Sequence, residues 1–301
     1  MTDSKTLAEL IARGEKDAPA IRAPERETMS FAGLQALCSE TVGVLNGAGI
    51  GRGDRVAIVL PNSPEMATAF VSIAAGGTAA PLNPAYQAKE FEFYLSDLAA
   101  KAVIVLAGGD SPVIEAAGKL NIPLIPLTPD TQGPAGAFTL SPPAGEATSA
   151  GGFAGADDIA LILHTSGTTS RPKIVPLSHA NIAASARNIS AWLELKPEDS
   201  CLNVMPLFHI HGLIAGAKPA IGEILRIGLF VILIAGCHVI AANDNFAGRA
   251  GRQQFSRRIH DRDLGAGGNA DTARAALTRR QRIARHLMRR FGHAVGFDDG
   301  S

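Results

Sequence analysis

The chain has 301 residues, enough for roughly two ordinary domains with a large core. Hydrophobic residues make up 46% and charged residues 19%, proportions that are typical of a globular protein and exclude one disordered throughout. The 28 basic and 28 acidic residues give a formal net charge of +0, so no overall field attracts nucleic acid or an anionic membrane. The N-terminal segment lacks a basic-then-apolar signal pattern, and we expect a cytoplasmic protein.

The first 216 residues alternate patterns of helices and strands. Helices are predicted within 6–14, 29–50, 62–77, 89–100, 111–120 and 178–195. Strands are predicted within 53–61, 101–108, 122–127, 158–167 and 173–177, and 199–216 reads as strand, loop and helix. This alternation predicts an α/β fold built from βαβ units, with a mostly parallel sheet that carries helices on both faces.

Residue types mark some boundaries of these elements. Ser63 can cap a helix that has Pro64 in its first position, and Gly76 and Gly77 stop that helix. A proline- and glycine-rich stretch over 128–155 shows no clear periodicity, and we expect a surface connection there. Three cysteines, an odd number without close spacing, are expected to be free thiols in a reducing compartment.

The stretch 163–179, LHTSGTTSRPKIVPLSH, carries the strongest chemical signal. A buried strand delivers a turn rich in hydroxyl groups, made of Thr165, Ser166, Gly167, Thr168 and Thr169. The glycine lets the backbone approach an anion closely, and exposed N–H groups and hydroxyls can hold phosphate oxygens. Lys173 adds a positive charge. A solvated Ser/Thr turn that binds nothing is the alternative, but the order of residues followed by Pro-Lys favours phosphate binding.

The stretch is neither a Walker A loop nor a dinucleotide fingerprint, because no Gly-Lys-[Ser/Thr] and no G-x-G-x-x-G follows a strand. Instead TSGTTSRPKIV resembles the signature of the adenylate-forming superfamily, except that Ser170 and Ile174 stand where glycine is usual. MPLFHIHGL, at 205–213, resembles a second motif of that superfamily. The two motifs are most similar to the branch of oxalate– and short-chain acid–CoA ligases, and the resemblance covers about residues 1–216.

The resemblance implies an incomplete N-terminal domain of the adenylate-forming fold. It implies that Thr165, Ser166, Gly167, Thr168, Thr169 and Lys173 hold the phosphates of ATP with Mg²⁺. It also implies that His209 lies beside the pocket for a small carboxylic acid and that, with Lys173, it belongs to the catalytic residues. The acid would form an acyl-adenylate, from which CoA displaces AMP.

Other histidines and aromatic residues have simpler interpretations. His209 and His211 form an H-x-H pair, but no third ligand is apparent nearby, so we predict no metal site. His164 and His179, at the two ends of the stretch, are interpreted as structural or solvated. Trp192 is interpreted as a packing residue of its helix.

Residues 217–301 differ in character from the rest. The last lysine is Lys218, the last glutamate is Glu223, and thirteen of twenty arginines follow residue 219. An apolar run of eleven residues between Arg226 and His238 is too short to cross a bilayer. We interpret this arginine-rich tail as out-of-frame or disordered sequence, and the alternative is a genuine extension that binds nucleic acid or lipid.

The family's later motifs for adenosine, Mg²⁺ and the adenylation lysine do not occur in the chain. The leading hypothesis is therefore an N-terminal fragment of an ATP-dependent acid–CoA ligase that is inactive and poorly soluble alone. The alternatives are a non-catalytic nucleotide- or phosphate-binding module and a nucleic-acid-binding protein that uses its tail. Binding of nucleic acid is disfavoured because few aromatic residues lie among the arginines.

Overall fold

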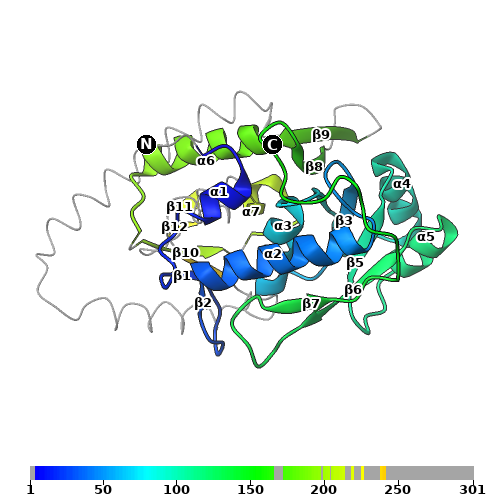
Figure 1. Cartoon of the computed structure of the whole chain (residues 1–301), viewed down its shortest axis with the longest axis horizontal. Helices are drawn as coiled ribbons and strands as arrows, with labels where there is room; N and C mark the ends of the chain where they lie inside the picture. Colours follow the sequence, from blue (N-terminus) through cyan, green and yellow to red (C-terminus); the bar gives the residue numbers. More distant parts are fainter. Residues whose placement is uncertain are drawn as a thin grey trace, which may run out of the picture.

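The computed structural model describes residues 4–165, 172–197, 199–203, 205–213, 218–219, 225–226 and 238–241. Figure 1 shows a layered α/β arrangement in which helices lie against a large sheet. The sheet has seven strands in the order β7-β6-β5-β3-β4-β8-β9. Their bounds are Arg55–Val59 (β3), Thr78–Pro81 (β4), Ala102–Leu106 (β5), Leu124–Pro129 (β6), Phe138–Leu140 (β7), Ile159–Thr165 (β8) and Lys173–Ser178 (β9).

The five central strands run parallel, and the two edge strands, β7 and β9, are antiparallel to their neighbours. The prediction of a mostly parallel sheet is therefore confirmed. The helices are Leu7–Ile11 (α1), Phe31–Gly47 (α2), Pro64–Ala74 (α3), Ala88–Leu98 (α4), Val113–Lys119 (α5), His179–Leu193 (α6) and Ile210–Leu213 (α7).

Helices cover both faces of the sheet because strand side chains point alternately to either side. Ile58 and Ile104 pack in a core with α1, α2, α3 and α6. Val59 and Val103, their neighbours along the same strands, pack in a second core with α4 and α5. The strands are apolar on both sides, as buried parallel strands must be.

Local signals place several helices as predicted. The Ser63 hydroxyl accepts a hydrogen bond from the Met66 N–H at 3.2 Å, and Pro64 occupies the first helical position of α3. In the same way Ser178 caps α6 by accepting from the N–H of Asn181 at 3.2 Å. A serine cap satisfies one of the free N–H groups of the first turn, so each helix begins where its serine stands.

The proline- and glycine-rich stretch is more ordered than its sequence indicates. It contains β7, which pairs with β6 and closes one edge of the sheet. Beyond β7 the chain packs along the end of α2, where Asn46 accepts hydrogen bonds from the N–H groups of Thr148 (2.9 Å, to its carbonyl) and Gly152 (2.6 Å, to its side chain). The surface connection predicted over 128–155 is thus partly strand.

A second sheet has the order β10-β13-β1-β2, with bounds Ser200–Asn203 (β10), His238–Ala241 (β13), Pro19–Arg22 (β1) and Met29–Ser30 (β2). Strand β13 is parallel to both β1 and β10. A short antiparallel pair joins Lys218–Pro219 (β11) to Leu225–Arg226 (β12). Beyond these strands the predicted tail, including the apolar run between Arg226 and His238, lies outside the described residues, and the domain boundary at 216 stays a prediction.

Arg26 joins α3 to the loop that precedes β7. Its Nη2 donates to the carbonyls of Asp130 (2.6 Å) and Pro134 (3.0 Å), and its Nη1 lies 3.2 Å from Oε1 of Glu65. The Glu65 side chain is only 9% exposed. A buried carboxylate that loses its cation retains the cost of leaving water, so this guanidinium matters more than a surface charge does.

Replacing Arg26 by alanine is expected to lower the free energy of unfolding by about 2 kcal/mol, because Glu65 and the loop carbonyls lose their donors. Urea denaturation would measure the change. Arg26→Lys keeps the positive charge without the planar guanidinium, so its free energy of unfolding should fall between those of wild type and Arg26→Ala. The control is Lys119→Ala, which removes the exposed pairs with Glu92 (2.7 Å) and Glu115 (2.8 Å) and should change stability little. Equal losses in both alanine variants would contradict the prediction.

Candidate functional site

The hairpin of β8 and β9 carries the predicted phosphate-binding stretch. Its pairing runs to Thr165 and Lys173, which are direct partners in the last rung. The Thr165 hydroxyl lies 3.5 Å from the carbonyl oxygen of Lys173. The turn between these strands, with Ser166, Gly167, Thr168 and Thr169, lies outside the described residues.

Thr165 and Lys173 present their side chains on one face of the hairpin, because direct cross-strand partners share a face. Both residues are exposed. Leu163, two residues before Thr165 and hence on its face, packs in the core with α3 and α6. A hydroxyl and an ammonium group therefore project together on the side of the sheet that these helices cover.

The position of this rung in the sheet is that of many ligand sites. Strands β3, β4 and β8 are parallel, so their carboxyl ends meet at one edge. Thr165 is the last residue of β8. In open α/β sheets ligands bind outside the carboxyl ends of the strands. The Thr165 hydroxyl and the Lys173 ammonium at that edge are groups that suit an anion.

Two asparagines hold the second predicted motif, and one of them, Asn62, comes from the same edge of the sheet. Asn62, shortly after β3, accepts a hydrogen bond from the Leu207 N–H at 3.0 Å. Asn203 is buried, accepts from the Met205 N–H at 3.0 Å and donates to the Gly212 carbonyl at 2.9 Å. These contacts fix the turn that precedes α7.

His209 is exposed on this turn. Its carbonyl accepts hydrogen bonds from the N–H groups of Gly212 (2.9 Å) and Leu213 (3.2 Å). Because Asn62 follows β3, the structure brings the segment of His209 to the edge where Thr165 and Lys173 lie. The motif did not point to Asn62, which is 145 residues from its partner. Asn203, two residues before the N–H it accepts, has the spacing of an Asx turn and could have been noticed.

The flanking histidines differ in burial: His179 is fully buried, whereas His164 is intermediate, although its side chain is only 6% exposed. His164 places its Nε2 3.1 Å from Oδ2 of Asp97, and burial lowers its pKa although Asp97 opposes the shift. The His179 side chain accepts a hydrogen bond from the N–H of Leu7 at 3.2 Å. The structural interpretation of His179 is confirmed by this contact.

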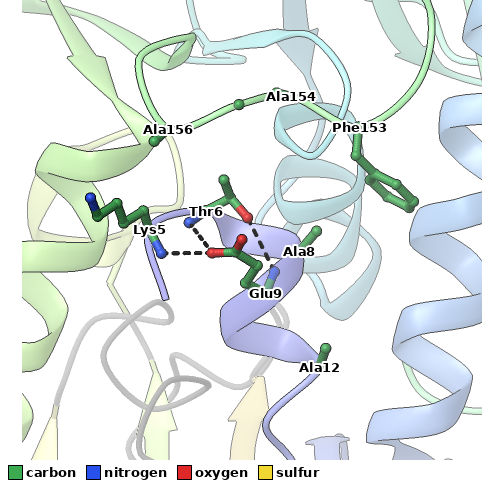
Figure 2. A pocket seen from close by; sticks show the side chains of 9 residues that line it. Lys5, Thr6, Ala8, Glu9, Ala12, Phe153, Ala154 and Ala156 are labelled. Carbon is green, nitrogen blue, oxygen red and sulfur yellow. Dashed lines mark hydrogen bonds between the residues drawn. The ribbon is translucent and has the colours of Figure 1, made fainter. Parts of the chain in front are cut away.

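A pocket of about 560 Å³ lies elsewhere, between α1 and residues 153–156 (Figure 2). Figure 2 shows Lys5, Glu9 and Phe153 around it. The Glu9 carboxylate accepts from the backbone N–H groups of Lys5 (2.7 Å) and Thr6 (3.1 Å), which lower its pKa. This carboxylate caps the start of α1. Of the predicted site residues that the structure describes, Thr165, Lys173 and His209, none lines the pocket.

The described residues also bear on metal binding and on insertion into a membrane. Within the described part of the chain, no group of three or more His, Cys, Asp or Glu side chains could hold a metal ion. The helices in that part include none that is both long and apolar enough to cross a membrane.

Comparison with known proteins agrees with the two motifs. The chain is 41% identical over 226 residues to an oxalate–CoA ligase of Arabidopsis thaliana, which covers 73% of this chain and 44% of that protein. It is 38% identical over 186 residues to an oxalate–CoA ligase of Saccharomyces cerevisiae, covering 54% and 34%. The chain thus spans less than half the length of these curated relatives.

Among solved structures, ATP-bound MatB from Rhodopseudomonas palustris is similar with a TM-score of 0.61 and 28% identity. The similarity covers 78% of this chain and 45% of that one. The fold is therefore that of the N-terminal part of an adenylate-forming enzyme. The family described as AMP-binding enzyme matches residues 9–230, well over half of the chain. The chain belongs to the AMP-binding enzyme family, and its relatives within that family are acid–CoA ligases.

Proposed function

We propose that this chain forms the phosphate-binding part of an ATP-dependent acid–CoA ligase. Thr165, Ser166, Gly167, Thr168, Thr169 and Lys173 would bind the phosphates of ATP. The observation that carries the proposal is the last rung of the β8–β9 hairpin, where an exposed hydroxyl and an exposed ammonium share one face at the carboxyl edge of the sheet. His209, at the same edge, would lie beside the carboxylate substrate.

The chemistry of an acid–CoA ligase needs positive charge and hydrogen-bond donors at this position. A carboxylate oxygen attacks the α-phosphorus of ATP, the bond to the β-phosphate oxygen breaks, and pyrophosphate leaves with the developing negative charge. The CoA sulfur then attacks the acyl carbon and AMP leaves. Lys173 and the hydroxyl groups would stabilise the pyrophosphate as it separates.

The donor set suits a polyphosphate rather than a protein-bound metal cage. Thr165 offers a neutral hydroxyl and Lys173 a cation, which together match phosphate oxygens. Mg²⁺ would accompany the ATP phosphates and supply further positive charge to them. CoA is the acyl acceptor that the acid–CoA ligase relatives name, and a small carboxylic acid such as the oxalate of those relatives is the proposed substrate.

We further propose that this chain binds ATP without completing the reaction alone. Residues 219–301 hold no lysine and residues 224–301 no glutamate. The later lysine and glutamate that the resemblance implies for adenylation and Mg²⁺ are therefore not among them. ATP–pyrophosphate exchange with oxalate tests this statement, and exchange above background would overturn it.

Replacing Lys173 by alanine is expected to weaken binding of MgATP at least about tenfold, since one charge-assisted contact to phosphate is worth roughly 1.5 kcal/mol or more. Isothermal titration calorimetry on the full chain measures the change. The matched control is Lys89→Ala, which removes an exposed lysine from α4 on the opposite side of the sheet. A wild-type chain that does not bind MgATP, or an unchanged Kd in Lys173→Ala, would refute the proposal.

A further inference from the structure

A histidine with a largely shielded side chain lies directly behind the proposed phosphate-binding rung. His164 precedes Thr165 in β8, and its side chain is 6% exposed. Its Nε2 lies 3.1 Å from Oδ2 of Asp97 on α4, 67 residues earlier in the chain. Neither the two motifs nor the proposed function uses this His164–Asp97 pair.

Aromatic rings hold the imidazole in place. The Tyr94 ring meets it edge-on, with centroids 4.7 Å apart and planes at 70°. Tyr94 in turn stacks on Tyr86 at 4.8 Å and 11°. Such contacts restrict the orientation of the ring, so Nε2 is directed at the carboxylate. Burial favours the neutral imidazole, whose Nε2–H then donates to Asp97.

His164 lies on the opposite face of the hairpin from Thr165 and Lys173. Its cross-strand partner is Ile174, which packs in the core that contains α4 and α5. Successive residues of a strand alternate between faces, so an anion held by Thr165 and Lys173 is separated from His164 by the hairpin backbone. Any effect of His164 on that anion must pass through the position of the backbone.

The end of the hairpin extends beyond its main support in the sheet. Strand β8 pairs with β4 at Leu161, whereas its pairing with β9 continues to Thr165. The His164–Asp97 hydrogen bond joins this extension to α4, a helix anchored by the fully buried Phe91 and Leu95. A hydrogen bond whose imidazole is shielded in this way adds a restraint on the two-stranded extension, although the Asp97 side chain is 38% exposed.

We infer that the His164–Asp97 pair is a positioning device that holds the end of the β8–β9 hairpin, and with it Thr165 and Lys173, ready for the phosphates of the nucleotide. The inference rests on the proposed function. It assigns His164 and Asp97 to the affinity for phosphate although neither touches it. Pre-ordering of the rung lowers the entropy that binding must otherwise remove.

The test measures binding of inorganic tripolyphosphate and of MgATP to the full chain by calorimetry, with thermal melting alongside. His164→Phe keeps the ring against Tyr94 but removes the donor, and Asp97→Ala removes the acceptor. Each is expected to weaken both ligands about fivefold, a loss of the size that one ordinary hydrogen bond contributes, because the pair acts on the ligand only through the position of the hairpin. The double variant should lose no more than either single variant, because the two side chains act as one unit.

Two further variants separate positioning from general destabilisation. His164→Gln still offers a donor to Asp97 and is expected to recover affinity to within about twofold of wild type. Arg26→Lys weakens the distant contact of Arg26 with Glu65 and the loop before β7, so it should lower the melting temperature without changing the affinity for phosphate. Affinity that follows melting temperature across all variants would overturn the inference, as would additive losses in the double variant.

The outcomes also distinguish this inference from the proposed function. If wild type binds, Lys173→Ala loses affinity, and both His164→Phe and Asp97→Ala match wild type, the positioning role alone is wrong. If the wild-type chain binds neither tripolyphosphate nor MgATP, the proposed function fails and this inference fails with it.

Discussion

Replacing Gly212 by alanine is expected to lower the free energy of unfolding by about 3 kcal/mol, at the upper end of the range for a group forced into filled space. A Cβ atom there would collide with the carbonyl oxygen of Pro206 and lie 2.8 Å from its carbonyl carbon. Both are backbone atoms, so the clash cannot be relieved by rotating a side chain. The turn that carries His209 would have to open.

The turn has little freedom to do so. The Gly212 N–H donates to the His209 carbonyl at 2.9 Å, and the Gly212 carbonyl accepts from Asn203 at 2.9 Å. Leu207 is tied to Asn62 on the other side. Movement of Gly212 away from Pro206 therefore breaks at least one of these hydrogen bonds, and a buried group left without a partner adds to the cost.

The control is Gly43→Ala, in the middle of α2, where an added Cβ would meet nothing within 4 Å. Alanine has a higher helix propensity than glycine, so this variant should be more stable than wild type by up to about 1 kcal/mol. Urea denaturation of both variants gives the comparison. The steric argument fails if Gly212→Ala unfolds at the same midpoint as wild type.

Strands that consist of large apolar side chains are predictable from the sequence. Runs such as Val56–Val59 and Val103–Val105 belong to β3 and β5, and both were expected as strands. Strand β4 was not, because its residues are Thr, Ala, Ala and Pro, which resemble a turn more than a core strand. It is a strand because it lies between β3 and β8, which supply its partners. Tertiary context of this kind cannot be recovered from local propensity.

The candidate site shows the same division. The order of hydroxyl residues, glycine and lysine in 165–173 indicated phosphate binding, and the motif of 205–213 indicated the family, because each is local in sequence. The supports of both segments are not local. Asn62 reaches Leu207 over 145 residues and His164 reaches Asp97 over 67, and single asparagine and aspartate residues carry no signal of such partners.

The two flanking histidines have distinct roles that their shared place beside the motif does not indicate. The sequence gives His164 and His179 the same interpretation, but they make different contacts in the structure. The first holds the hairpin to α4 from the face opposite Lys173, whereas the second joins α1 to α6. Their difference arises from strand and helix geometry, because His164 alternates with Thr165 along a strand and His179 is the first residue of a helix.

His179 is a buried neutral base in the core, and it makes the fold sensitive to acid. Its side chain is 0% exposed, and Nδ1 accepts the N–H of Leu7 at 3.2 Å. An acceptor nitrogen needs its lone pair, so the neutral ring carries its proton on Nε2. Burial lowers the His179 pKa to about 4, although the charge of Asp158 acts in the opposite direction.

The sign of the pH effect follows from the lowered pKa. The folded state resists protonation of His179, whereas the unfolded state takes up the proton near the ordinary value of about 6.5. The contribution of neutral His179 to stability is therefore fully present above about pH 6.5, and it is lost as the pH decreases towards about 4. A difference of this size corresponds to a loss of about 3 kcal/mol over that interval.

Urea denaturation of wild type and His179→Gln between pH 7.5 and about 4 isolates this contribution. Glutamine offers an oxygen that can accept from Leu7 but does not titrate, so the variant should be less sensitive to acid by up to about 3 kcal/mol. Carboxylates away from His179 contribute to both profiles and cancel in the comparison. Parallel pH profiles for the two proteins would show that His179 is not the group that limits stability in acid. A steeper wild-type profile would instead place the acid-sensitive contact at the junction of α1 and α6, away from the β8–β9 hairpin.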